Sequence, residues 1–234
     1  MKKFTIAIIM LAGTISNAFA TAQFPDRVFY EGEMYMLHTN PMESYFIKHP
    51  DKRPRGNVMS TALNRGYVAT FEFKTNALLL KDIKIRISED KDDGKWVTSW
   101  KSVRDDFVPK DGTLLVDWFT GILVLPHGTI VEYVHGGYGS TYSDYILLEI
   151  KEGRLKDKRA FDHKQLKEFK KQQFQAFKET EDYRKQAETF RSRNRTQEEI
   201  DSIIGYHILS YISEFLGKEE KKEQPSNKPS EAIQ

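Results

Sequence analysis

From about residue 27 to residue 149, apolar and polar positions alternate in short runs separated by turn residues, a pattern typical of β-strands. Residues 28–30 and 34–37 flank a Glu-Gly-Glu turn and predict a hairpin. Residues 67–73 and 78–87 predict a second, longer pair of strands around a short polar turn. Parallel neighbours need long crossover connections, so these short links predict a mainly antiparallel sheet. Further strands are expected at 113–119, 122–125, 129–134 and 145–150, with a short helix at 42–48.

After residue 158 the apolar positions recur with a helical period. Asp162 and Gln165 have the spacing of a capping box and predict the start of a helix over residues 163–190. That helix carries many Lys, Gln and Glu residues beside a thin set of phenylalanines. We therefore expect it to be half exposed, and we expect its exposed Phe and Gln side chains to form a docking surface for a partner.

A second helix is predicted from another capping box at Thr196 and Glu199. Isoleucines and aromatic residues follow on one face, together with His207, and Gly217 is expected to end the helix. The basic link over residues 191–195 between the two helices predicts a helical hairpin.

These patterns together predict an α+β protein with a mainly antiparallel β domain over residues 22–158 and a C-terminal helical hairpin over residues 159–217. Residues 218–234 are charged, contain prolines and have few apolar side chains. Such a segment cannot bury enough surface to offset its ordering entropy, so a disordered tail is expected there.

The first twenty residues have the three parts of a secretory signal peptide. Two lysines precede an apolar stretch, and the A-F-A string that ends at Ala20 is a small-x-small cleavage site. The apolar stretch is shorter than the roughly 20 residues that a membrane-spanning helix needs. Thr14 stands where a lipoprotein signal would require cysteine. We predict cleavage near Ala20 and a periplasmic or secreted bacterial protein with no membrane span and no lipid anchor.

Charge and cysteine content narrow the function classes. The 36 basic residues, less Lys2 and Lys3 of the predicted signal, equal the 34 acidic residues. A balanced chain has no bulk electrostatic reason to bind nucleic acid. The chain has no cysteine, which excludes disulfides, thiol catalysis and cysteine metal ligands.

The most distinctive string, His-Gly-Gly-Tyr-Gly-Ser-Thr-Tyr, covers residues 135–142. Its opening is similar to the oxyanion-hole loop of some lipases and esterases, but the chain lacks the G-x-S-x-G nucleophile motif of those enzymes. Two alternatives remain: a glycine-rich connection between strands, or a ligand-binding loop that contains His135, Tyr138 and Tyr142.

Other candidate chemistry is weaker. The acidic string at residues 88–94 does not match the EF-hand spacing, so a solvated turn is the preferred interpretation over a calcium site. No two histidines have a spacing that would place both on one face as metal ligands. Trp96, Trp100 and Trp118 are expected in the core of the sheet, with a sugar-stacking surface as the alternative. We predict no metal and no cofactor.

Three further strings carry a resemblance to a known group. They are N-P-M-E at residues 40–43, R-G-Y-V-A at residues 65–69 and G-Y-G-S at residues 137–140. Over roughly residues 27–155 the chain resembles a group of uncharacterised bacterial proteins with N-P-[LM]-E, R-G-Y-x-A and G-Y-x-S strings. The resemblance implies a domain type and no catalytic residues. It draws attention to Arg65, Tyr67, His135 and Tyr138, which with Tyr142 are the predicted binding residues.

The function predicted from the sequence is therefore an exported binding or protein-interaction module of the bacterial envelope. Its expected partner is another envelope or secreted protein, and it is not expected to bind nucleic acid. The alternative is a periplasmic hydrolase with a composite site near His135.

Overall fold

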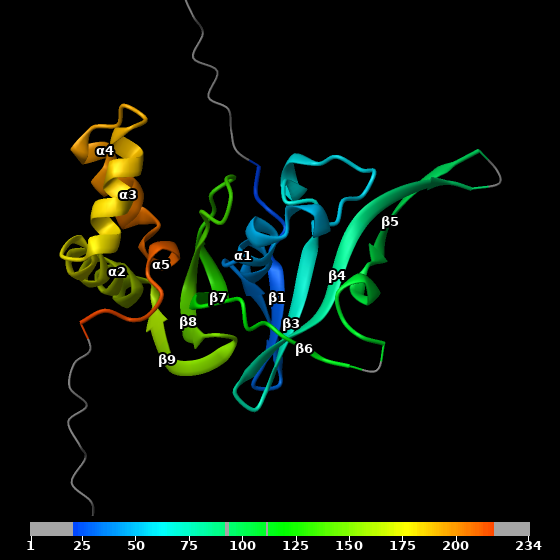
Figure 1. Cartoon of the computed structure of the whole chain (residues 1–234), viewed down its shortest axis with the longest axis horizontal. Coiled ribbons are helices and arrows are strands. Elements are labelled where there is room, and N and C mark those ends of the chain that lie inside the picture. Colours follow the sequence, from blue (N-terminus) through cyan, green and yellow to red (C-terminus); the bar gives the residue numbers. More distant parts are fainter. Residues whose placement is uncertain (1–20, 92–93, 111, 218–234) are drawn as a thin grey trace, which may run out of the picture.

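The computed structural model describes residues 21–91, 94–110 and 112–217 (Figure 1). Within them lies a nine-stranded, mostly antiparallel sheet followed by C-terminal helices, which confirms the predicted mixed class. The predicted signal peptide, residues 1–20, and the predicted tail, residues 218–234, lie outside the described residues.

The strands follow one another in the order β2-β1-β3-β4-β9-β8-β7, and β5 and β6 both pair with β4. Every pairing is antiparallel except that of β1 with β3. The strands are β1 (Asp26–Tyr30), β2 (Glu33–Leu37), β3 (Val68–Lys74), β4 (Ala77–Asp90), β5 (Trp96–Ser102), β6 (Leu114–Leu115), β7 (Gly121–Glu132), β8 (Thr141–Lys151) and β9 (Arg154–Asp162).

The two outer strands of this order, β2 and β7, also meet. Just after β2, the backbone N–H of His38 donates to the carbonyl oxygen of Val124 at 2.9 Å. The Thr39 hydroxyl accepts from the Val124 N–H at 3.1 Å and donates to the Ile122 carbonyl at 3.0 Å. The sheet therefore curls around an apolar interior formed mainly by β1, β3, β4 and one face of β7 and β8.

Strand β8 separates two apolar cores: a first core in the interior of the curled sheet, and a second core between the outer face of β7 and β8 and the C-terminal helices. Its six residues from 145 to 150 are all buried, because both faces of the strand are covered. Ile146 and Leu148 point into the interior of the curled sheet, and Tyr145 and Leu147 pack on the opposite face against the C-terminal helices. This double burial explains why the strand has no polar alternation in the sequence.

The helices are α1 (Pro41–Lys48), α2 (His163–Lys178), α3 (Glu181–Arg191), α4 (Gln197–Tyr206) and α5 (Ile208–Tyr211). Three short 3-10 helices lie at Pro50–Lys52, Thr61–Leu63 and Arg104–Asp106. Both predicted capping boxes are present, at Asp162 and at Thr196.

The predicted long helix over residues 163–190 is wrong in its length. It is interrupted after Lys178, because the Thr180 hydroxyl accepts the Tyr183 N–H and so begins α3. The second predicted helix is interrupted at His207 and ends at Tyr211 rather than at Gly217. Four shorter helices therefore stand where two were expected.

The expectation that the phenylalanines of residues 163–190 are exposed is also wrong. Phe169 and Phe177 are buried in the second core, and Phe174 and Phe190 pack partly buried against it. Their side chains pack in the core between the helices and the outer face of β7 and β8.

The last described residues are fastened to the same core. The Glu149 carboxylate, on β8, accepts the Phe215 N–H at 2.8 Å. The Gln173 side chain, on α2, donates to the Leu216 carbonyl at 2.9 Å and accepts its N–H at 2.7 Å. Both polar side chains are buried and use backbone partners, as buried polar groups require.

The β4–β5 ribbon extends beyond the rest of the sheet (Figure 1). Trp96 and Trp100 on β5 are 71% and 42% exposed, so their expected place in the core is wrong. Trp118 is partly buried against the first core, and its indole N–H donates to the Pro41 carbonyl at 3.2 Å. None of the helices in the described residues is long and apolar enough to cross a membrane.

Candidate functional site

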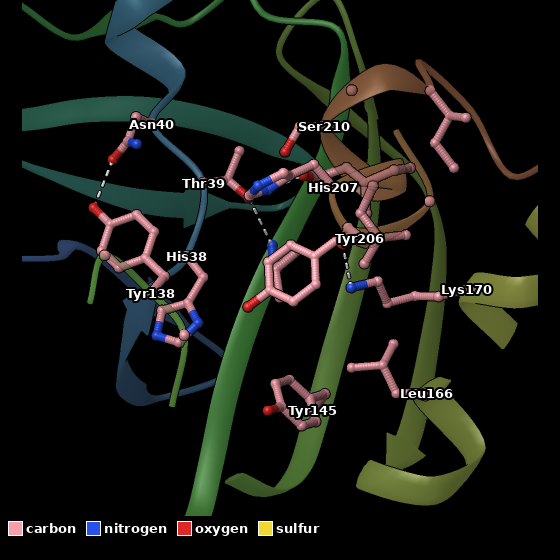
Figure 2. Close-up of a pocket in the computed structure, with 18 of the residues that line it drawn as sticks. His38, Thr39, Asn40, Tyr138, Tyr145, Leu166, Lys170, Tyr206, His207 and Ser210 are labelled. Carbon is pink, nitrogen blue, oxygen red and sulfur yellow. Dashed lines mark hydrogen bonds between the residues drawn. The ribbon is translucent and has the colours of Figure 1, made fainter. Parts of the chain in front are cut away.

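Arg65 joins the three strings that carried the resemblance. It lies between a 3-10 helix and β3, and one of its terminal nitrogens, Nη1, donates to both the Asn40 side-chain oxygen and the Tyr138 hydroxyl. The Tyr138 hydroxyl in turn donates to the Asn40 oxygen at 2.9 Å (Figure 2). Segments around residues 40, 65 and 138 thus meet in one polar cluster.

Asp26 lies beneath this cluster and is fully buried. Its Oδ1 accepts from the Arg65 Nη2 at 3.0 Å and from the Ala69 N–H at 2.8 Å. Neither its Oδ2 nor the Arg65 Nε has a hydrogen-bond partner among the described residues. Burial raises the pKa of Asp26 to about 7, although Arg65 and the Ala69 N–H act in the opposite direction.

A second network lies beside the first. The Tyr67 hydroxyl donates to the Glu43 carboxylate at 2.7 Å, and Arg53 donates to the same carboxylate at 2.8 and 2.9 Å. Burial would raise the pKa of Glu43, but the bonds from Arg53 and Tyr67 hold it below its ordinary value. Burial together with the nearby acids raises the pKa of Tyr67. Tyr67 is therefore a structural link between α1 and the start of β3.

His38 belongs to this region and was missed in the sequence. Its ring stacks on Tyr138 with centroids 4.8 Å apart and planes 7° apart, and meets the edge of Tyr142 at 5.7 Å. Burial lowers the pKa of His38 to about 4, so the ring is neutral near pH 7. Its only signal in the sequence was its place two residues before the N-P-M-E string.

His135 stands apart from these groups. It is exposed, and its Nδ1 shares a hydrogen bond with the Tyr133 hydroxyl at 2.9 Å. The structure thus brings Arg65, Tyr67, Tyr138 and Tyr142 into one region and leaves His135 at its margin.

The glycine-rich loop is held by the beginning of the described chain. Gln23 N–H donates to the Gly137 carbonyl at 3.2 Å, and Gly137 N–H donates to the Thr21 carbonyl at 3.3 Å. Gly137 has φ +55°, a conformation that favours glycine. The loop is therefore a fixed structural element with two backbone anchors.

A cleft of about 1340 Å³ separates this loop from the helices. Its floor is formed by β7 and β8, one wall by the residues around His38 and Tyr138, and the opposite wall by α2, α4 and α5 (Figure 2). We call it the helix–sheet cleft. Most of its lining is apolar, and its lining residues include His38, Asn40, Ile122, Val124, Tyr138, Tyr145, Leu166, Lys167, Lys170, Phe174, Tyr206, His207, Leu209 and Ser210.

Cationic side chains lie on the helical wall. The half-buried Lys170 donates from Nζ to the Tyr206 carbonyl at 2.5 Å. Burial lowers the pKa of Lys170, and burial together with the charge of Lys170 lowers the pKa of His207. In the described part of the chain, no group of three His, Asp or Glu residues is arranged to hold a metal ion.

Comparison with known proteins adds no family: no family model matches the chain, and no curated protein or solved structure is significantly similar to it.

Proposed function

We propose that this chain is an exported binding protein that holds a small ligand in the helix–sheet cleft. The observation that supports this most directly is the cleft itself, an open space with an apolar floor and polar groups on both walls. Small-molecule sites combine these features: apolar surface provides affinity, and a few fixed polar groups orient the ligand. Export is part of the proposal and rests on the signal-like first twenty residues.

The cleft is larger than most ligand pockets. Ligand pockets usually measure roughly 300–1,000 Å³. At about 1340 Å³ the cleft is large enough for a ligand with an extended apolar part. The cleft also lies where two layers of the fold meet, which is a common place for binding sites.

Binding is better supported than hydrolysis. His38 lines the cleft, but its ring is neutral and stacked on Tyr138. His135, the centre of the alternative proposal, is bonded to Tyr133 at the margin. Among the described residues, no serine or threonine hydroxyl is hydrogen-bonded to either ring, so the geometry does not favour a general-base step that activates such a nucleophile.

A neutral fluorescent probe, N-phenyl-1-naphthylamine, tests the proposed function. The folded protein should bind it at one saturable site. Ser210→Trp, which would place a large ring inside the cleft, should reduce that binding at least about tenfold. Ser213→Trp is the matched control, since Ser213 is exposed and does not line the cleft. Equal binding by the two variants would contradict the proposal.

A second candidate, interaction with another exported protein, is favoured by the β4–β5 ribbon. Strand β5 pairs with β4 alone among the described strands, and Trp96 is 71% exposed on it. An unpaired strand edge with exposed aromatic residues is a typical surface for strand addition. If this surface is used, Trp96→Ser should abolish cross-linking to an envelope partner and leave probe binding unchanged.

A further inference from the structure

The most unusual group in the helix–sheet cleft is the ammonium of Lys170. Its neighbour Lys171 is paired with Glu168 at 2.7 Å. Lys170, by contrast, makes no ion pair with any acid of the described residues. Its Nζ bonds to the Tyr206 carbonyl and lies 5.1 Å from the centre of the Tyr206 ring.

Three acids line the same cleft: two are already engaged, and the third, the exposed Glu132, forms no ion pair with Lys170. Asp201 accepts from the Tyr183 hydroxyl and from the Gln197 side chain. Glu43 accepts from Arg53 and Tyr67. Neither carboxylate pairs with Lys170, so the charge on the helical wall is not compensated by these groups.

A half-buried cation without a counter-charge is costly. An ammonium has three N–H donors, and the Tyr206 carbonyl uses one of them. Burial disfavours the charged form of Lys170 and so lowers its pKa. An anion placed at Nζ would remove this cost and accept the remaining donors.

The surface next to Lys170 is apolar. Leu166 and Phe174 flank it one turn away on α2, and Ile122, Val124 and Leu209 line the same cleft. In the close-up, Leu166 lies beside Lys170, and Tyr145 lies beyond Leu166 on the floor of the cleft (Figure 2). A ligand that satisfies both features needs a negatively charged end and an apolar body.

We propose that the ligand is a free amphiphilic anion, an alkyl chain with a carboxylate head, whose head lies at Lys170 Nζ and whose chain lies on the apolar floor. The proposal rests on the binding function proposed above and specifies its ligand class. An alcohol of the same chain length would fill the same surface without compensating the charge.

A simpler explanation is that Lys170 only stabilises the end of α4, where cations near carbonyl groups are favourable. This explanation predicts that Lys170→Met lowers stability and leaves the preference between head groups unchanged. The two explanations are therefore separable by measuring the head-group preference.

The experiment measures displacement of N-phenyl-1-naphthylamine by monomeric dodecanoate and by dodecanol at neutral pH. The wild-type protein should bind dodecanoate about tenfold more tightly than dodecanol, as expected for a hydrogen bond to a charged group. Lys170→Met should reduce this ratio to about one, and Lys170→Arg should keep most of it. Lys164→Met, which removes an exposed charge of α2 outside the cleft, should leave the ratio unchanged.

Each contrary outcome has a distinct meaning. Equal displacement by dodecanoate and dodecanol in the wild-type protein overturns the ligand class and leaves the binding function standing. A preference that survives in Lys170→Met overturns the role of Lys170. Binding to vesicles of anionic phospholipid without binding of monomeric dodecanoate overturns the free ligand in favour of a membrane surface. Absence of any binding, of the probe included, overturns the proposed function as well.

Discussion

Arg65 and Tyr138 share a hydrogen bond that joins segments 73 residues apart in the chain. Through it the glycine-rich loop is fastened to the start of β3, and Tyr138 is held in place to stack on His38 at the edge of the cleft. One contact therefore links the buried Asp26–Arg65 pair to the shape of the proposed binding site.

Tyr138→Phe should destabilise the fold by about 1–2 kcal/mol. The substitution keeps the ring on His38 but removes the hydroxyl that binds Arg65 and Asn40, so each of these part-buried groups loses one hydrogen bond and keeps only the bond between them at this point. Urea unfolding measures the difference.

His135→Ala is the contrast to Tyr138→Phe. The exposed His135 ring contacts Tyr133 only at the margin, so its loss should change stability by less than about 0.5 kcal/mol. The opposite order of the two effects would contradict the network described here. It would also make His135 the structurally important member of the loop.

Part of this network could be predicted from the sequence. Arg65, Tyr67 and Tyr138 were recognised because they lie beside glycines in distinctive strings. Asp26 was not, because an acid at the start of a strand is ordinarily exposed, and only the tertiary fold buries it beneath Arg65. Lys170 was missed for the same reason: in the sequence it is one of many lysines on a helix.

The secondary-structure elements were likewise predicted only in part. Strands with one buried face, such as β3 and β4, were found, because burial on one side leaves a period of two in the sequence. Strand β5 is exposed throughout and has no such period, so it was missed. The interruption at Thr180 depends on one side-chain cap within an otherwise helical pattern, which composition does not reveal.

Asp26→Asn should change how stability depends on pH. The folded chain holds the Asp26 proton up to a pKa of about 7, well above the ordinary value for Asp. Between about pH 4 and pH 7 the folded state therefore binds more protons than the unfolded state, so this group makes the protein less stable as the pH rises. Relative to Asp26→Asn, the wild type should lose up to about 1.4 kcal/mol per pH unit in this window.

The measurement is urea unfolding of both proteins at pH 5 and at pH 8. A stability difference that does not change between these values would show that Asp26 ionises normally in the folded chain. Asn is the suitable replacement, because it has nearly the shape of the protonated acid and does not titrate.

His38→Gln should show the opposite dependence. Burial lowers the pKa of His38 to about 4, below its ordinary value of 6.5. Between these values the unfolded state binds more protons, so the contribution of His38 is present above about pH 6.5 and is lost as the pH falls towards 4. The wild type should therefore weaken relative to His38→Gln over that interval. An upward trend on acidification would contradict the burial of the ring.

Because the two effects have opposite signs between about pH 4 and pH 6.5, they should partly cancel in the wild type. In Asp26→Asn the remaining effect of His38 should lower the free energy of unfolding as the pH falls. In His38→Gln the remaining effect of Asp26 should raise it. Comparing the pH dependence of stability in the two variants therefore tests the pKa of Asp26 and the pKa of His38 at the same time.

Removal of residues 21–23 should loosen the glycine-rich loop. Thr21 and Gln23 supply both backbone hydrogen bonds to Gly137, and the Gln23 side chain also donates to the Thr61 carbonyl at 2.6 Å. A chain that begins at Phe24 lacks both of these backbone bonds, and the Gly137 N–H loses its acceptor. Because each bond stabilises the loop by about 1 kcal/mol or more, the Gly137 amide should exchange with solvent at least about tenfold faster.

Hydrogen exchange measures this effect, and the Ile146 amide in the buried strand β8 serves as the internal control. If exchange at Gly137 and Ile146 accelerates together, the deletion has lowered global stability and has not freed the loop alone. If Gly137 is unaffected, the first described residues do not hold the loop. Selective acceleration at Gly137, accompanied by weaker probe binding in the cleft that this loop lines, would tie the residues just after the predicted cleavage at Ala20 to the proposed binding function.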